Sequence, residues 1–152
     1  MKYIIAGNGP AAVHGAKAIR RRDPEGEILM ISPEEGQPYS RITMPEYMTG
    51  EVSEENTCFE RDFYEEYHVR TCLGRRVTGV NPQRHYVTLD DGDTVSYEKL
   101  LIATGSHSLL PPWANLEIPG VCGLWNKEDA RAIAAQTKAE GKAVIVGGGL
   151  VG

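Results

Sequence analysis

The chain has 152 residues, of which 41% are hydrophobic and 24% charged, and its formal net charge is −5. This length allows one buried core, and the acidic balance excludes nucleic acid as an expected partner because phosphate affinity depends on Lys and Arg. No apolar stretch approaches the ~20 residues that a transmembrane helix needs, so we expect no membrane association.

The first predicted unit is a strand, a turn, a helix and a second strand. Residues 2–6, with an apolar run over 3–6 that ends at Gly7, predict a short buried strand. Pro10 falls in the first turn of the following helix, where its missing N–H costs nothing. Residues 27–32 form the second strand, which completes a β-α-β context for the glycines between the first strand and the helix.

The middle of the chain predicts shorter elements. We expect residues 33–57 to be irregular with short helical pieces, and the aromatic spacing of residues 59–67 to form a short amphipathic helix. A meander of short strands follows, made of residues 69–73, 77–80, 85–89 and 94–97. Residues 100–103 predict a further apolar strand.

The last part of the chain predicts the start of a second unit. Asn126 suits the N-cap of a helix that Gly141 ends, and residues 143–146 predict a strand. We divide the chain into residues 1–112, a linker and helix over 113–142, and the start of a second nucleotide-binding domain over 143–152. The unpaired edge of that strand makes self-association an expectation.

Two glycine-rich fingerprints carry the chemistry. In the first, Gly7 permits a tight turn, Gly9 lets the backbone approach a pyrophosphate, and Ala12 allows close packing of helix on strand. Pro10 and Ala11 contribute through backbone and shape, and the helix N-terminus offers free N–H groups to phosphate. The second fingerprint spans residues 147–152, so the chain ends inside it and we expect a longer parent protein.

An acid about 20 residues after the fingerprint commonly binds a ribose hydroxyl, and Glu34 is the candidate. The three cysteines, Cys58, Cys72 and Cys122, form no C-x-x-C pair, which favours a reducing compartment and hence the cytoplasm. Neither these cysteines nor the four histidines show metal-ligand spacing, so no metal is expected.

The chain resembles the N-terminal part of pyridine nucleotide-disulfide oxidoreductase-type flavoproteins, in the branch of rubredoxin reductase, nitrite reductase large subunit and apoptosis-inducing factor. The resemblance rests on the two fingerprints, on Pro-Tyr-Ser-Arg at 38–41 and on Ala-Thr-Gly at 103–105. It implies an α/β, Rossmann-like FAD-binding domain, with a parallel sheet, helices and a small antiparallel meander. It also implies that this domain is incomplete here.

The resemblance assigns further site residues. Arg41 would lie along FAD, the backbone of Val77 would meet the adenine, and Ala103, Thr104 and Gly105 would pass close to the cofactor. Gly147, Gly149 and Gly152 would begin the site for NAD(P)H in the complete protein.

Two features depart from the family pattern. The ribose-binding acid of the family falls on Pro33, which leaves Glu34 as its substitute. The family's redox cysteines are missing, and Ile42 stands where one of them would lie. We therefore expect Ile42 and Pro45 to line the flavin and electrons to leave it without a redox-active disulfide.

The resulting hypothesis is an FAD-dependent oxidoreductase that passes electrons from NAD(P)H to an acceptor such as a small redox protein. No catalytic acid or base is predicted, and we expect these 152 residues alone to oxidise NAD(P)H weakly or not at all. A non-catalytic nucleotide-binding or assembly module remains the alternative. A simple dehydrogenase with a nicotinamide at the first fingerprint is disfavoured by the Tyr-Ser-Arg and Ala-Thr-Gly elements.

Overall fold

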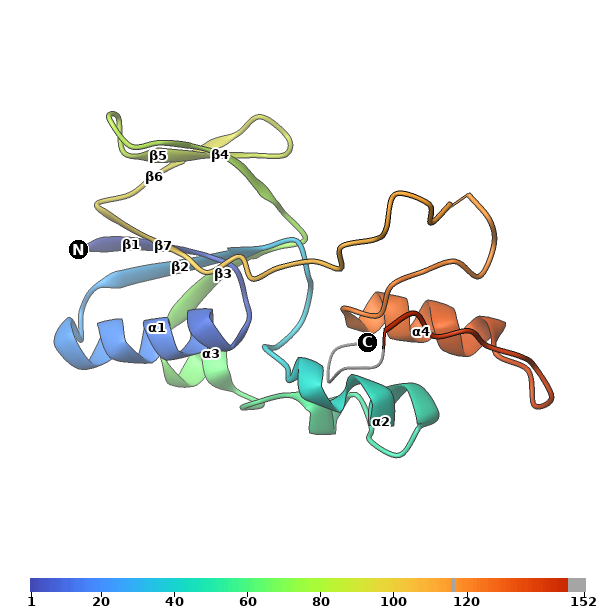
Figure 1. Cartoon of the computed structure of the whole chain (residues 1–152). Helices are drawn as coiled ribbons and strands as arrows, with labels where there is room; N and C mark the ends of the chain where they lie inside the picture. The colour runs from blue at the N-terminus through green and yellow to red at the C-terminus, as the bar shows by residue number, and fades with distance from the viewer. Residues whose placement is uncertain (116, 148–152) are drawn as a thin grey trace.

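The computed structural model describes residues 1–115 and 117–147, and its centre is a parallel sheet of four strands in the order β3-β2-β1-β7 (Figure 1). The strands are β1 (Lys2–Ala6), β2 (Glu27–Ser32), β3 (Val69–Leu73) and β7 (Lys99–Ile102). β1 lies inside the sheet, with Tyr3 paired to Ile28 on one side and to Lys99 on the other. The carboxyl ends of all four strands therefore meet at one edge.

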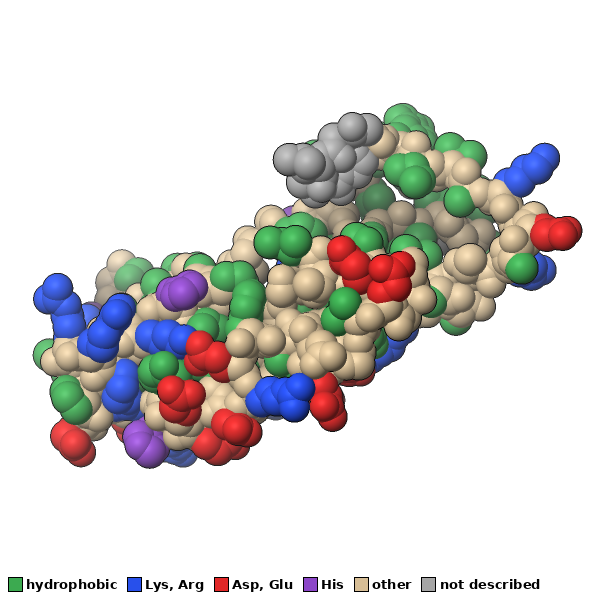
Figure 2. Space-filling model, turned by 90° about the horizontal axis from the view of Figure 1, so that it is seen from below, with side chains coloured by type: hydrophobic (Ala, Val, Ile, Leu, Met, Phe, Trp, Pro, Cys, Tyr) green, Lys and Arg blue, Asp and Glu red, His purple; other side chains and the backbone are tan. Residues whose placement is uncertain are grey.

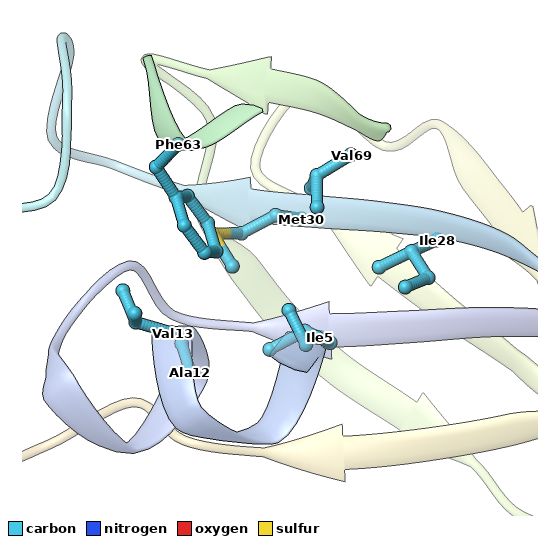
Figure 3. Close-up of a cluster of buried hydrophobic side chains, with 8 residues drawn as sticks. Ile5, Ala12, Val13, Ile28, Met30, Phe63 and Val69 are labelled. Atoms are coloured by element: carbon cyan, nitrogen blue, oxygen red, sulfur yellow. The ribbon is translucent and has the colours of Figure 1, made fainter. Parts of the chain in front are cut away.

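Two helices cover one face of this sheet: α1 (Pro10–Arg22) and the short α3 (Phe63–Glu66). Figure 3 shows the core between them, where apolar side chains of α1, α3 and the strands point toward one another. Phe63 is completely buried, whereas Phe59 is 41% exposed and lies outside the helix. The predicted amphipathic helix over residues 59–67 is therefore shorter than expected.

An antiparallel sheet of three strands lies over the opposite face (Figure 1). Its strands are β4 (Val77–Asn81), β5 (Tyr86–Leu89) and β6 (Thr94–Ser96). Val87 and Leu89 of this sheet pack against Ile4 and Ile31 of the parallel sheet in a second core cluster. The predicted α/β architecture, with a parallel sheet, helices and a small meander, is confirmed.

The prediction that residues 69–73 belong to the meander is wrong. β3 pairs in parallel with β2, and Ile28 lies opposite Val69. The strand occupies an edge position where only Val69 is buried, so its sequence pattern looks like that of a short hairpin strand. Periodicity predicts that a strand exists but does not identify its partner.

The segment between β2 and α3 forms short helices, and one of them, α2, packs against α4 (Lys127–Gln136). These pieces are η1 (Arg41–Thr43), α2 (Met44–Thr49) and η2 (Glu55–Thr57), as the sequence predicts. Arg131 of α4 donates hydrogen bonds to the Tyr47 hydroxyl at 2.9 Å and to the Glu54 carboxylate at 2.7 Å. These polar contacts hold α4 beside α2 (Figure 1).

Helix α4 begins as predicted, at Asn126, whose side chain forms a reciprocal capping box with Asp129. It ends at Gln136 rather than at Gly141, because Thr137 is already extended with ψ of 136°. Gly141 instead closes a separate turn, in which its N–H donates to Lys138 O at 2.9 Å.

The predicted strand over residues 143–146 does not form, which corrects the assignment of a second β-unit there. Val144, Ile145 and Val146 are 91%, 81% and 64% exposed. A strand is stable only with hydrogen-bonded neighbours, and within residues 1–115 and 117–147 none pairs with this segment.

Arg20, near the end of α1, forms hydrogen bonds with two loops at the amino end of the sheet. Its guanidinium donates to the carbonyl oxygens of Tyr67 and His68 at 2.9 Å, of Pro24 at 2.7 Å and of Gly26 at 2.8 Å. The helix C-terminus also suits a cation at this position. Arg20 therefore has a structural role in the turn before β2 and in the turn before β3.

The surface seen from below in Figure 1 carries Lys and Arg side chains intermingled with Asp and Glu (Figure 2). This face therefore offers no broad basic area of the kind that binds nucleic acid. Among the described residues, no helix has both the length and the apolar character needed to cross a bilayer.

Candidate functional site

The turn between β1 and α1 is held in a conformation that requires glycine. Gly7 has φ of +123°, and a Cβ placed on it would lie 2.1 Å from the carbonyl oxygen of Ala103. The Gly7 N–H donates to Ile31 O at 2.8 Å, and the Ala103 N–H donates to Ala6 O at 2.8 Å. The ends of β1, β2 and β7 therefore meet tightly around Gly7.

The N-terminus of α1 is open to an anion. Gly9 is its N-cap and provides no side-chain hydrogen bond, and the first turn contains no acidic residue. A Cβ placed on Gly9 would meet nothing within 4 Å, so the space in front of the turn is free. The backbone N–H groups of Ala11 and Ala12, together with the helix dipole, suit a phosphate group there.

A charged cluster lies beside this turn. Arg41 forms an ion pair with Glu34, and the buried Tyr39 hydroxyl donates a hydrogen bond to the same carboxylate. These three side chains and residues Asn8 and Gly9 line one small hollow. Burial, followed by the hydrogen bond to Glu34, raises the pKa of Tyr39 well above its usual range, so its hydroxyl stays protonated.

Asn8 is fixed in the turn by a second network that the sequence did not reveal. The Tyr64 hydroxyl lies 2.9 Å from Asn8 Oδ1 and 2.9 Å from Gly36 O. Burial raises the pKa of Tyr64 to about 12. A polar residue between the two glycines of the fingerprint was the only available sign of this contact.

Trp125 is another residue that sequence reasoning missed, since it lies 84 positions after Arg41. Its carbonyl oxygen accepts a hydrogen bond of 2.6 Å from Arg41 Nη1, and its ring centroid lies 5.0 Å from the Arg41 guanidinium carbon. The segment before α4 thus contacts Arg41, one of the residues that line the hollow.

The structure gathers most of the sequence-predicted residues at the carboxyl edge of the parallel sheet. The turn and the start of α1 contain Gly7, Gly9, Pro10, Ala11 and Ala12. The neighbouring strand β7 is followed by Ala103, Thr104 and Gly105. Val77 begins β4, immediately after a turn in which Arg75 N–H donates to Ser32 O at 3.0 Å.

The remaining predicted residues lie elsewhere. Ile42 is 87% exposed in η1, Pro45 is exposed in α2, and neither lines the hollow. Gly147 is exposed with φ of +120°. Gly149 and Gly152 lie outside the described residues, so their assignments stay predictions.

A larger cavity of about 310 Å³ lies between β1, β7 and α1, away from the fingerprint turn. Its lining includes the apolar side chains of Ile4, Ile19, Leu100 and Leu101. Apart from Tyr3, Gly15 and Lys99 its lining is apolar, so we place the site at the smaller hollow beside Gly9.

Cys58, Cys72 and Cys122 are all free thiols. In the part of the chain that the structure describes, no three His, Cys, Asp or Glu side chains are grouped as metal ligands. The candidate site is therefore built from backbone N–H groups and the Glu34–Tyr39–Arg41 cluster.

A parallel sheet with an open, glycine-capped helix N-terminus and an acid after its second strand defines a Rossmann-type dinucleotide-binding domain. The chain belongs to the pyridine nucleotide-disulphide oxidoreductase family, whose model matches residues 1–152.

Named relatives agree with this membership. The ferredoxin–NAD(+) reductase subunit of the benzene 1,2-dioxygenase system of Pseudomonas putida is 32% identical over 149 residues, which cover 97% of this chain and 36% of the relative. NADH:rubredoxin oxidoreductase from Clostridium acetobutylicum superposes with a TM-score of 0.82 at 32% identity, covering 97% of this chain and 38% of that structure.

The reductase in a covalent putidaredoxin reductase–putidaredoxin complex has a TM-score of 0.76 at 26% identity, covering 89% of this chain and 34% of that one. The chain thus spans little more than a third of the length of the relatives that it matches.

Proposed function

We propose that the protein is an FAD-dependent oxidoreductase that takes electrons from NAD(P)H and passes them through FAD to a small redox protein. The observation that carries this proposal is the open N-terminus of α1 beside the Glu34–Tyr39–Arg41 cluster. The functions named for its relatives, reductases of ferredoxin and rubredoxin, support the same chemistry.

The chain's own residues would bind and orient the dinucleotide. The N–H groups of Ala11 and Ala12 donate to the pyrophosphate, and Arg41 offsets its charge. Each carboxylate oxygen of Glu34 accepts one hydrogen bond within the cluster and keeps a lone pair for a ribose hydroxyl. Gly7 and Gly9 keep the turn narrow enough for the backbone to approach.

The family resemblance supports further contacts, which extend beyond the hollow itself. The backbone of Val77 would meet the adenine. The residues after β7, Ala103, Thr104 and Gly105, would lie along the cofactor. The flavin would be lined by Ile42 and Pro45. When bound, FAD supplies the redox chemistry, so no protein nucleophile or catalytic thiol is required.

We further propose that residues 1–112 form the FAD-binding part, that 113–142 connect it, and that 143–152 begin the nicotinamide-binding part with Gly147, Gly149 and Gly152. A cytoplasmic location suits the free thiols, since a reducing compartment keeps cysteines unpaired.

The test is the visible spectrum of the whole protein after purification. We expect a flavin absorption band near stoichiometry, bleaching of that band on anaerobic addition of NADH or NADPH, and release of FAD on denaturation. A colourless protein that also fails to take up added FAD would refute the proposal. A flavin band that neither nucleotide bleaches would favour the non-catalytic binding module.

A further inference from the structure

We infer that Trp125 is a positioning residue of the dinucleotide site, which holds the guanidinium of Arg41 ready for the cofactor. The inference rests on the proposed function and adds a contribution from the segment that leads into α4. Trp125 precedes Asn126, the N-cap of α4, and belongs to no strand of the parallel sheet.

Arg41 lies near two aromatic rings. Its guanidinium carbon lies 5.3 Å from the ring centroid of Tyr39 and 5.0 Å from that of Trp125. Both distances fall within the ~6 Å range in which a cation is attracted to an aromatic face. These two contacts restrict the long side chain of Arg41, which is otherwise rich in rotamers.

Hydrogen bonds then fix the direction of the guanidinium. Nη1 donates to Trp125 O at 2.6 Å and to the Tyr39 hydroxyl at 3.2 Å, and Nη2 donates to Glu34. A guanidinium has five N–H donors. Among the described residues these contacts use three of them, so two stay available to an anionic ligand.

The Trp125 carbonyl is itself held in place by the capping box of α4. Asp129 Oδ2 accepts from the Trp125 N–H at 2.9 Å and from the Asn126 N–H at 3.1 Å. Arg131 anchors the same helix to Glu54 and Tyr47. Arg41 is thus positioned by a helix whose own placement is secured by other contacts.

This arrangement lowers the cost of binding, because an ordered side chain loses less rotamer freedom when the ligand arrives. Ordering one such side chain is worth about a two- to tenfold difference in affinity. It also couples the site to α4: any change that moves the helix N-terminus away from Arg41 would weaken cofactor binding.

The test measures the dissociation constant of FAD for the whole protein by flavin fluorescence. Trp125→Leu removes the ring and should weaken binding about fivefold, whereas Trp125→Phe retains an aromatic face and should recover most of the affinity. Trp113→Leu is the matched control, since Trp113 is 69% exposed and should leave binding unchanged.

A second comparison separates positioning from general damage. In an Arg41→Ala background, Trp125→Leu should have no further effect, because the guanidinium that it positions is gone. Equal weakening by Trp125→Leu with and without Arg41 would overturn the inference, as would unchanged binding in the single variant. Absence of FAD binding by the wild-type protein would instead refute the proposed function.

Asp129→Ala provides an independent variant that keeps the Trp125 ring. It removes the acceptor of the Trp125 and Asn126 N–H groups and should weaken FAD binding in the same direction. The circular dichroism spectrum of each variant should match that of the wild type. A folded Asp129→Ala protein with wild-type FAD affinity would count against positioning through the helix cap.

Discussion

Separate replacements of Gly7 and Gly9 should distinguish two roles of the first fingerprint: Gly7 is needed for the structure of the turn, and Gly9 for cofactor binding. In Gly7→Ala, the new Cβ would lie 2.1 Å from Ala103 O, in a backbone conformation with φ of +123°. Such a φ costs a non-glycine residue about 1–3 kcal/mol. Relieving the overlap must also move Ala103 and weaken its hydrogen bond to Ala6, which is worth about 1 kcal/mol.

We therefore expect Gly7→Ala to lower the free energy of unfolding by about 3 kcal/mol or more, a large part of the ~5–15 kcal/mol typical of a domain. Gly9→Ala places its Cβ in open space at an ordinary φ of −89°. It should cost less than about 1 kcal/mol of stability, the scale of a helix-cap change.

Urea unfolding followed by circular dichroism measures both changes, and flavin fluorescence measures FAD affinity. Gly9→Ala should weaken FAD binding about tenfold or more, because its methyl group occupies the space that the pyrophosphate needs. A Gly7→Ala protein as stable as the wild type would refute the reasoning about the turn. Undiminished FAD affinity in Gly9→Ala would contradict the placement of the phosphate.

Three further predictions concern other contacts. Arg20→Ala should lower the free energy of unfolding by about 2–4 kcal/mol in urea titrations, because it removes hydrogen bonds to several loop carbonyls. Arg21 is exposed, so the control variant Arg21→Ala should change the free energy of unfolding by less than about 0.5 kcal/mol. The pKa of Tyr64 is raised to about 12, so the absorbance near 295 nm should show one tyrosine that ionises near that pH. Because the unfolded chain ionises this group at its ordinary pKa of ~10, the free energy of unfolding should fall as pH rises above ~10. Tyr64→Phe should abolish the ionisation seen near pH 12. Arg131 holds the pKa of Glu54 below its usual range, so the contact of α4 with α2 should weaken as pH falls below ~4.3 and Glu54 becomes protonated. Tryptophan emission should report this change. Glu54→Gln should remove the pH dependence of the emission.

The first β-α-β unit was predictable because its signals are local. Apolar runs, the glycines of the turn and Pro10 all act within a few residues of one another, and β1, α1 and β2 form where expected. The placement of Glu34 near Arg41 was also accessible, since the two lie within one short segment after β2.

Features that depend on distant partners could not be read in this way. The pairing of β3 with β2, the contact of Tyr64 with Asn8 and that of Trp125 with Arg41 join segments far apart in the chain. The failure of residues 143–146 to form a strand has the same origin, because a strand is decided by its neighbours rather than by its own residues.

The central position of β1 also determines how the protein can acquire its structure during synthesis. Tyr3 pairs with Lys99, so one side of the first strand made stays unpaired until β7 is synthesised. At ~5–20 residues per second, that wait lasts several seconds on the ribosome. Closing so long a loop is entropically slow, and the edge of β1 stays exposed until β7 emerges. The nascent chain is therefore most vulnerable to mispairing in the interval before residue 99, when a chaperone would protect it best.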